Sequence, residues 1–518
     1  MATSRIACDC PVLPLPSLRH ERVGIARVEP GPETRLVGRV LHLDLSAPDY
    51  GSERDVVAMA IDVIPPDRRS VACDSILDVA PIAVKVEGDI GSGQTRVTSG
   101  LALVMTGREE RGVQAGEFGA SAGVLAERIH PDAPGAPDRE GWLIRVAVTL
   151  RDGSAKERRG PLAAHRVADL VAERVRRALR EAPDAPIESA VEWAEVRRPQ
   201  GVRVLLAKMV MGQGAMHEKL LLPSEPAGIT GGRSIIELGQ GPVMLRVNEL
   251  RDGAIHSLCC VSPSTKETTL HHFRDPLVER LADDPAIDLL GVAVFGSPAA
   301  ELDKRFVAER LATMTSTVAP DGVIVATEGF GNNHIDWAHA IAQILKHGTP
   351  TVGVTWAASQ GRLVVGNEYL VPLIDTNRSP DGRETLRLGE NTATPAVAAR
   401  AVTMLRSFVA GIDIQPAPSA WDPTVITANQ RLVAEAGPTG LCDALRSEIP
   451  VPHLMTPPLT PLRVRLSEAR VALVSAAGAP CRTVPPESWP STPQWARRSG
   501  SRPISSSSDE SSAPRWRS

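Results

Sequence analysis

The feature that most constrains the fold is a set of four mostly apolar runs of strand length in the second half of the chain. They span residues 202–211, 287–296, 321–329 and 351–356, and Gly, Asp or Pro residues bound each of them. Strands that are apolar on both faces are typical of parallel sheets covered by helices on both sides. Residues 334–348 have the spacing of an amphipathic helix that ends in Gly348. Strand, helix and strand in this order predict a βαβ unit and therefore an α/β domain.

The first half of the chain has a different pattern. Between residues 34 and 149, short β-branched runs alternate with Gly, Pro and Asp turns, which predicts a β-rich domain. Helical spacing follows over 161–180, and a further helix is expected over 395–410. We therefore expect an irregular arm over 1–30, a β-rich domain with a C-terminal helix over 31–200, an α/β domain with a largely parallel sheet over 201–440, and a disordered Pro/Ser-rich tail over 441–518.

Composition argues against several classes of partner. The formal net charge of −4 and the isoelectric point near 6.3 give no general attraction to nucleic acid or to anionic membranes. No apolar stretch has the length of a signal peptide or of a membrane span. Seven cysteines at irregular spacings are too few for a disulfide framework and fit a reducing compartment. We expect a cytoplasmic protein that binds neither nucleic acid nor membrane.

Reactive side chains are densest in HSLCCVSPSTKETTLHHF, which contains His256, Cys259, Cys260, His271 and His272. A zinc site is disfavoured, because adjacent cysteines on a strand point apart, and we expect no metal there. Two interpretations stay open. The cysteines can be a buried pair of small thiols, or the segment can process itself, with a thiolate attacking the carbonyl before it. For that reaction Cys260, the carbonyl of Cys259 and a histidine are the required groups.

A second group of polar residues lies in TEGFGNNHIDWA, where an apolar strand ends and a helix begins. Ligands of open α/β sheets gather outside the carboxyl ends of strands, and helix N-termini favour anions such as a carboxylate. The candidates for substrate binding are Glu328, Asn332, Asn333, His334 and Asp336. Helix capping is the alternative role for Asn333 or Asp336. No Walker or GxGxxG pattern is present, so nucleotide binding is not indicated.

Eight long motifs in a fixed order, spread over residues 34–422, resemble the D-proline reductase proprotein family. They are GSGQTRVTSGLALVMTG, GVQAGEFGASAG, RRGPLAAHR, MGQGAMHEKLLLP, HSLCCVSPSTKE, VFGSPAAE, TEGFGNNHIDWA and VGVTWAASQGRLVVGN. A looser similarity connects the same segments to the component B proproteins of glycine, sarcosine and betaine reductases. Residues 458–478 resemble the start of the second, catalytic subunit, so we interpret the tail as the remnant of a fused second subunit.

The resemblance implies that the chain cuts itself before a cysteine, which then becomes a pyruvoyl group. Cys260 matches that cysteine, because it directly precedes Val261, Ser262 and Pro263. The residue before the cut is usually threonine in this family, or asparagine in the glycine reductase relatives, and here it is Cys259. The implied cofactor is therefore a covalent pyruvoyl group made from Cys260, with no nucleotide, flavin or metal.

The implied reaction is the reductive opening of the D-proline ring to 5-aminopentanoate, in which a selenocysteine- or cysteine-containing partner subunit acts as the reducing nucleophile. This predicts a hetero-oligomer. Asn332 and Asn333 are expected to bind the substrate carboxylate, and His271, His272 or His334 to move protons. We also expect residues 328–336 to lie close to Cys260. The alternatives are a component B proprotein of glycine, sarcosine or betaine reductase, or an unprocessed binding or scaffold subunit.

Overall fold

The computed structural model describes residues 15–412 except for 52, 116–121, 156–158, 211–220, 223–224, 229–235, 238, 258–266, 299, 328–332, 357–368, 370–371 and 378–386. All of these described residues belong to a compact unit that covers Met1–Leu462, and none belongs to the second unit, Arg463–Ser518. Within the described part of the chain, no helix is long and apolar enough to cross a membrane.

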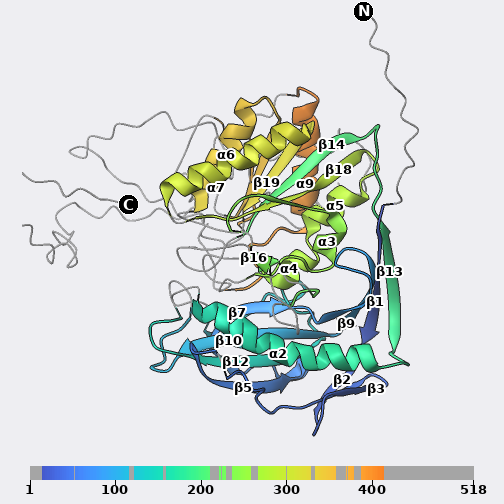
Figure 1. Cartoon of the computed structure of the whole chain (residues 1–518), viewed down its shortest axis with the longest axis vertical. Coiled ribbons are helices and arrows are strands. Elements are labelled where there is room, and N and C mark those ends of the chain that lie inside the picture. Colours follow the sequence, from blue (N-terminus) through green and yellow to red (C-terminus); the bar gives the residue numbers. More distant parts are fainter. Residues whose placement is uncertain are drawn as a thin grey trace, which may run out of the picture. The chain divides into compact units, whose positions relative to one another are not determined.

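The N-terminal half is built on two four-stranded sheets (Figure 1). The first has the order β13 (Ile187–Ala194), β1 (Ser17–Gly24), β9 (Gly93–Ser99) and β8 (Ala83–Glu87). The second has the order β5 (Val56–Ile64), β12 (Trp142–Leu150), β10 (Leu101–Glu109) and β7 (Ser75–Ala80). Smaller elements are β2 (Arg27–Pro30), β3 (Arg35–Val37), β4 (Val40–Leu43), β6 (Ala72–Cys73), β11 (Gly123–Val124), a 3-10 turn (Pro66–Arg68) and α1 (Leu125–Arg128).

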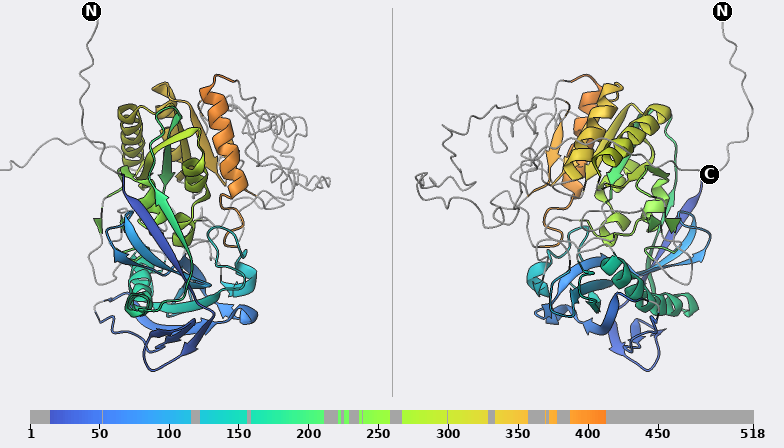
Figure 2. Two further views of the ribbon diagram at one scale, coloured as in Figure 1. Left: turned by 90° about the vertical axis from the view of Figure 1, so that its right-hand side faces the viewer. Right: turned by 60° about the vertical axis from the view of Figure 1, so that its left-hand side comes forward.

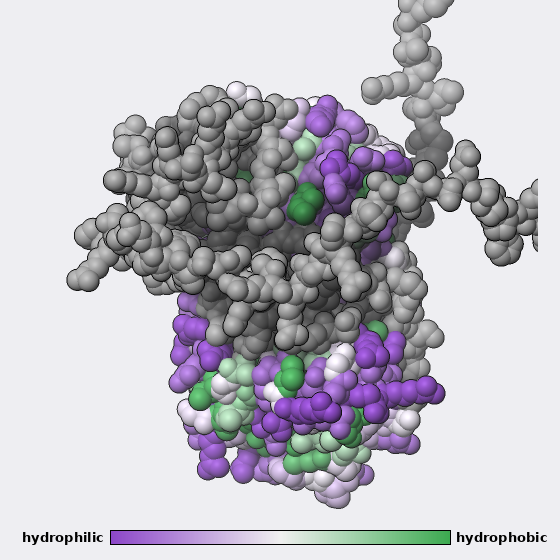
Figure 3. Space-filling model, turned by 90° about the vertical axis from the view of Figure 1, so that its left-hand side faces the viewer, coloured by the Kyte–Doolittle hydropathy of each residue, from purple (hydrophilic) through white to green (hydrophobic). Residues whose placement is uncertain are grey.

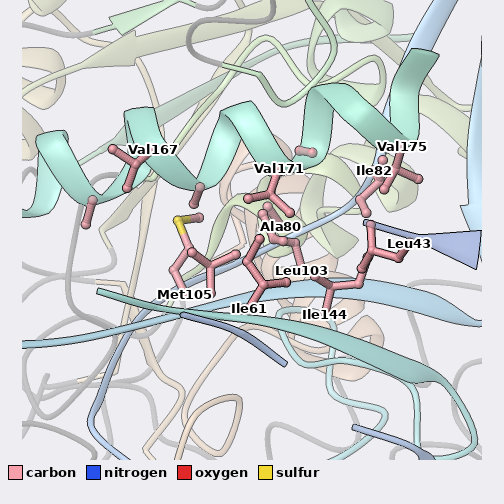
Figure 4. Close-up of a cluster of buried hydrophobic side chains, with 14 of the residues drawn as sticks. Leu43, Ile61, Ala80, Ile82, Leu103, Met105, Ile144, Val167, Val171 and Val175 are labelled. Atoms are coloured by element: carbon pink, nitrogen blue, oxygen red, sulfur yellow. The ribbon is translucent and has the colours of Figure 1, made fainter. Parts of the chain in front are cut away.

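Helix α2 (Arg159–Glu181) covers the second sheet and confirms the helix expected over 161–180. Its residues Val167, Val171 and Val175 repeat every four positions and therefore lie on one face. Figure 4 shows this face packed against side chains of several strands, among them Leu103, Met105 and Ile144. The repeated apolar contact fixes the helix on the sheet and buries His165 beneath it.

The second half contains a six-stranded sheet, in the order β17 (Val243–Leu245), β18 (Ile287–Phe295), β14 (Val202–Met209), β19 (Gly322–Thr327), β20 (Thr351–Thr355) and β21 (Leu373–Asp375). All neighbouring pairs are parallel except β17 with β18. The other elements are α3 (Val247–Arg251), α4 (Thr269–Phe273), β15 (Leu221–Leu222) and β16 (Ile236–Glu237). The α/β architecture expected from the sequence is confirmed.

Helices cover both faces of this sheet because alternate residues of its strands are apolar on each side. Leu205 and Ala207 share a core with α6 (Glu301–Val318) and α7 (Asn333–Lys346). Val204 and Leu206 share another with α5 (Pro276–Asp283) and α9 (Pro395–Val409). Figure 2 shows α9, in orange, on the face opposite α6 and α7.

The order of the parallel strands creates a switch point between β14 and β19. The chain runs from β14 to β18 on one side, and then crosses to β19 on the other side of β14. Ligands of doubly wound sheets bind outside the carboxyl ends of the strands at such a point. The two strands end together, since Met209 pairs with Thr327. Segments 211–220 and 328–332, which follow these ends, lie outside the described residues.

The arm expected over 1–30 is wrong for residues 17–30, which form β1 and β2. Leu18 and His20 are buried within β1, whereas charged residues alternate with them and hide the pattern. The strand is also stabilised by partners distant in sequence, β9 and β13. Residues 413–518, including the expected tail, lie outside the described part. On the face in Figure 3, apolar side chains of described residues are interspersed with hydrophilic ones.

Candidate active site

A buried ionic group, here called the Lys208 cluster, lies at the carboxyl end of β14. It consists of Lys208, Glu267, His271, His272 and Asp275, each at most 6% exposed. Lys208 Nζ is 3.0 Å from Glu267 Oε2 and also contacts Asp275 Oδ2. His271 Nε2 is 3.1 Å from Glu267 Oε1. Buried charges need such partners, so these side chains are held in fixed positions.

Electrostatic interactions set the protonation states of the Lys208 cluster. Burial opposes ionisation of Glu267, but Lys208 and His271 outweigh it and hold the pKa of Glu267 well below its ordinary value. Burial likewise opposes the charge of Lys208, whose pKa is nevertheless raised by Asp275 and Glu267. Burial and Lys208 lower the pKa of His272 to about 4. Near neutral pH, His272 is therefore uncharged, and its ring offers a lone pair as a hydrogen-bond acceptor.

A second buried group, the Asp78 cluster, joins the two halves of the protein. It consists of Asp78 on β7, His165 on α2, His256 and Ser257 just before residues 258–266, and Thr269 at the start of α4. Thr269 donates its backbone N–H to Asp78 Oδ1 at 2.9 Å and its hydroxyl to Asp78 Oδ2. The same hydroxyl accepts the Ser257 N–H at 2.8 Å. Asp78 thus fixes the chain on both sides of residues 258–266.

The ends of this segment are also tied to each other. Ser257 Oγ donates to the Glu267 carbonyl at 3.2 Å. At the same helix start, Thr268 Oγ1 donates to the Gly135 carbonyl at 2.7 Å and accepts from the His271 N–H. The predicted cleavage residues, Cys259 and Cys260, lie between these ends but outside the described residues. Three residues span at most about 11 Å, so chain connectivity limits how far Cys260 can be from Ser257.

The predicted substrate residues are partly described. Asn333, His334 and Asp336 are buried in the first turn of α7, whereas Glu328 and Asn332 lie outside the described residues. Asp336 Oδ1 is 3.2 Å from Lys304 Nζ, which donates to Ser297 Oγ at 3.0 Å. Burial raises the pKa of Asp336 to about 6 against the opposing effect of Lys304. Burial also lowers the pKa of His334 to about 4.

The strand register places described residues next to the two predicted regions near one edge of the sheet. Lys208, which binds Glu267, pairs with Ala326, one residue before the end of β19. Glu267, just after the cysteine segment, therefore contacts β14 near its carboxyl end, and the neighbouring strand β19 ends at Thr327, just before the substrate loop. The expected closeness of Cys260 to residues 328–336 stays a prediction, because most of those residues are not described.

Sequence reasoning missed Asp78, His165, Lys208 and Glu267. A signal existed for Lys208, since a charged residue inside an apolar strand must find a buried partner. The sequence could not identify that partner, because Glu267 and Asp275 are far from Lys208 along the chain and do not belong to a strand that pairs with β14. Nor does helical spacing distinguish His165 from an ordinary core histidine.

A cavity of about 290 Å³ lies beside α4 but does not include these clusters. Its lining includes Trp142, Trp193, Leu270, Phe273 and Arg274. None of the predicted site residues within the described part of the chain lines it. The chemistry is therefore better sought at the sheet edge, where the buried ionisable side chains are.

Comparisons with known proteins relate the chain to reductase subunits. Residues 146–362 match the family described as glycine/sarcosine/betaine reductase component B subunits. A D-proline reductase proprotein of Acetoanaerobium sticklandii is 39% identical over 422 residues, which are 81% of this chain and 67% of the relative. Component B subunits alpha and beta of the glycine reductase complex from the same organism are 26% identical, over 64% of this chain and 77% of the relative.

A sarcosine reductase complex component B subunit alpha of Peptoclostridium acidaminophilum is also 26% identical, over 55% of this chain and 66% of the relative. No solved structure matches the chain. The matched family region contains β14 and β19, the Lys208 cluster, Asp336, and every residue of the Asp78 cluster except Asp78 itself. On its identity and coverage, the chain belongs to the D-proline reductase proprotein family.

Proposed function

We propose that this chain is the self-processing subunit of a D-proline reductase, with a pyruvoyl group formed from Cys260. The observation that carries the proposal is the 39% identity to a D-proline reductase proprotein, against 26% for the glycine and sarcosine reductase components. The reaction would open the D-proline ring to 5-aminopentanoate. A component B function toward glycine, sarcosine or betaine is the alternative.

The hydrogen bonds around residues 258–266 are compatible with a pyruvoyl group that forms from the chain itself between Ser257 and Glu267. Both ends of that segment are hydrogen-bonded, to each other and, through Thr269, to Asp78. Self-cleavage requires that the carbonyl of Cys259 be held close to the attacking thiol of Cys260. Fixed positions of Ser257 and Glu267, at the two ends of the segment, favour that arrangement. The neutral His272 and the ionised Glu267 then provide acceptor groups at the C-terminal end of the segment.

For processing, the Cys260 thiol would attack the carbonyl of Cys259 and replace the peptide bond with a thioester. The proton leaves the thiol for a nearby base, for which His271 and His272 are the candidates. Lys208 would hold Glu267 ionised throughout, so that the carboxylate orients His271 through the 3.1 Å contact. β-Elimination would then break the Cβ–S bond of residue 260, so that the sulfur leaves with the N-terminal fragment as a thiocarboxylate on Cys259. Water would hydrolyse the resulting dehydroalanine, through its imine, to the ketone and release ammonia.

For reduction, a pyruvoyl group supplies a ketone that draws electrons from the substrate C–N bond. The first turn of α7, with Asn333 and the neighbouring Asn332, would bind the substrate carboxylate through backbone and side-chain N–H groups. Asp336, whose pKa is about 6, is suited to exchanging a proton near neutral pH. The reducing selenolate or thiolate would come from a partner subunit in a hetero-oligomer.

We expect the processed chain to reduce D-proline only when a dithiol and the partner subunit are both present. The isolated chain should be inactive, because it lacks the reducing nucleophile. Product formation with D-proline, glycine and betaine should be measured side by side. Betaine is a sharp control, since its quaternary nitrogen cannot form a double bond to the ketone carbon. Turnover of glycine or betaine without D-proline would reject the substrate assignment and favour the component B function.

Replacing Asn333 with alanine should lower kcat/KM for D-proline while leaving self-cleavage intact. A lost charge-assisted hydrogen bond to the substrate carboxylate costs about 1–3 kcal/mol, or roughly 5- to 150-fold. Steady-state kinetics and intact mass measure the two effects separately. Gln343→Ala, in the last turn of the same helix, is the matched control and should change neither. Unaltered kinetics in Asn333→Ala would remove this residue from the substrate site.

A further inference from the structure

We propose that Asp78, His165 and His256 form a binding site for one divalent transition-metal ion, with Zn²⁺ as the best-suited candidate. The three side chains come from β7, from α2 and from the chain just before Ser257. Imidazole and carboxylate groups are the usual ligands of such ions. The inference does not rest on the proposed reductase function, because metal binding can be measured without turnover.

The distances suit a shared ion. His165 Nε2 is 3.4 Å from Asp78 Oδ2, and His256 Nε2 is 4.0 Å from the same oxygen. One ligand atom from each of the three residues lies within 4.8 Å of the others. Ligands at about 2.0–2.2 Å from one zinc ion are separated by about 3.4 Å at the tetrahedral angle, and by more at wider angles. The observed spacing therefore allows all three to bind one ion with small adjustments.

The hydrogen bonding of His165 directs a lone pair into the site. Its Nδ1 is 2.6 Å from the Pro161 carbonyl oxygen, which can only accept a hydrogen bond. Nδ1 therefore carries the hydrogen, and Nε2 of the neutral ring is an acceptor that faces the Asp78 carboxylate. Two acceptors facing each other in a buried site need a cation between them. A backbone carbonyl on the outer nitrogen is also the usual support of a metal-binding histidine.

A proton on His165 Nε2 is the competing explanation, and the geometry argues against it. A charge-assisted hydrogen bond between imidazolium and carboxylate is about 2.7–2.9 Å long, whereas the observed separation is 3.4 Å. Among the described residues, the buried Nε2 atoms of His165 and His256 have no hydrogen-bond partner. Buried polar atoms need a partner, and an ion bound between the two rings and the carboxylate would provide one.

The Lys208 cluster provides an internal contrast. Glu267, His271 and Asp275 also offer three buried ligand atoms that lie close together. There, however, the ammonium group of Lys208 contacts both carboxylates and already supplies the positive charge. In the Asp78 cluster the described contacts of the carboxylate come from hydroxyl, N–H and imidazole groups. Only this second cluster needs an added cation.

A bound ion would cross-link three separate parts of the chain. It would hold His256, and with it the entry to residues 258–266, against β7 and α2. All three ligands precede Cys260, so the site would stay within one fragment after the proposed cleavage. Three protein ligands leave a coordination position open in a tetrahedral zinc site, which water or another donor can fill.

The test is the metal content of the full-length protein, measured by mass spectrometry after equilibration with Zn²⁺ and removal of the unbound ion. The wild-type protein should hold about one ion per chain, and Zn²⁺ should raise its unfolding temperature. His165→Gln and His256→Gln should each weaken binding by at least about tenfold. His20→Gln is the matched control, because His20 is also buried beside an aspartate, Asp252, and should leave the metal content unchanged.

A wild-type protein that takes up no Zn²⁺, Mn²⁺, Fe²⁺ or Co²⁺ would overturn the proposal in favour of a protonated His165. The same holds if the wild type binds an ion that both variants retain at full affinity. Circular dichroism should accompany the comparison of variants. If a variant does not fold, the Zn²⁺ titration of the wild-type protein decides the question alone.

Discussion

Replacing Cys260 with alanine should leave the protein as one uncut chain of 55.2 kDa, whereas the wild-type protein should yield residues 1–259 and 260–518. The physical reason is that a methyl group cannot attack the preceding carbonyl, so no thioester forms. Intact mass under denaturing conditions measures the outcome. Borohydride or hydroxylamine should modify only the C-terminal fragment of the wild type, since that fragment carries the ketone.

Cys259→Thr is the matched control, because it places the residue usual in this family before the cut. This variant should still be cleaved. Cleavage of Cys260→Ala together with loss of cleavage in Cys259→Thr would move the site to Cys259. A wild-type chain that stays uncut after both aerobic and anaerobic purification would reject the pyruvoyl group and favour an unprocessed binding subunit.

Replacing Lys208 with methionine should destabilise the protein by about 3–5 kcal/mol, because two carboxylates then remain buried without their partner. Lys208 is only 1% exposed, and its ammonium group contacts both Glu267 and Asp275. Denaturant unfolding of the wild type and the variant measures the difference. The loss should exceed that of most single substitutions.

Two further variants identify the cause. Arg305→Met removes an exposed ion pair with Glu301, one turn away on α6, and should cost at most about 1 kcal/mol. Adding Glu267→Gln and Asp275→Asn to Lys208→Met removes the unpaired charges and should recover part of the lost stability. Asn can still cap α5 in place of Asp275, which accepts the Leu277 N–H. Failure of the triple variant to recover stability would assign the loss to packing instead.

Local pattern was sufficient for much of the fold. The apolar runs at 202–211 and 321–329 become β14 and β19, and the helices expected over 334–348 and 395–410 become α7 and α9. The two helices show the period of an amphipathic helix in their apolar residues, and the two strands are apolar on both faces. Both patterns indicate the type of secondary structure clearly. By contrast, β1 and β13 contain charged residues without a clear period of two, and they pair with each other although they stand near the two ends of the first domain's sequence.

The site was predictable only in part for a related reason. Asn333, His334 and Asp336 follow a strand end, a position that the sequence reveals. The ligand set of the proposed metal site has no sequence signature, since Asp78, His165 and His256 come from three distant elements. The expectation of no metal concerns Cys259, Cys260 and the histidines near them, among them His256, and does not involve Asp78 or His165. Only the fold brings such groups together.

The strand order of the second domain has a consequence for a cleaved protein. β14 and β17 precede residue 260, whereas β18 and β19 follow it, and β14 is hydrogen-bonded along both edges to those later strands. The two products of the cut would therefore be interwoven within a single sheet. Neither could leave by simple dissociation, because separation would require unfolding the core. Dilution should not release them, and the nicked protein should elute from gel filtration at the size of the intact one.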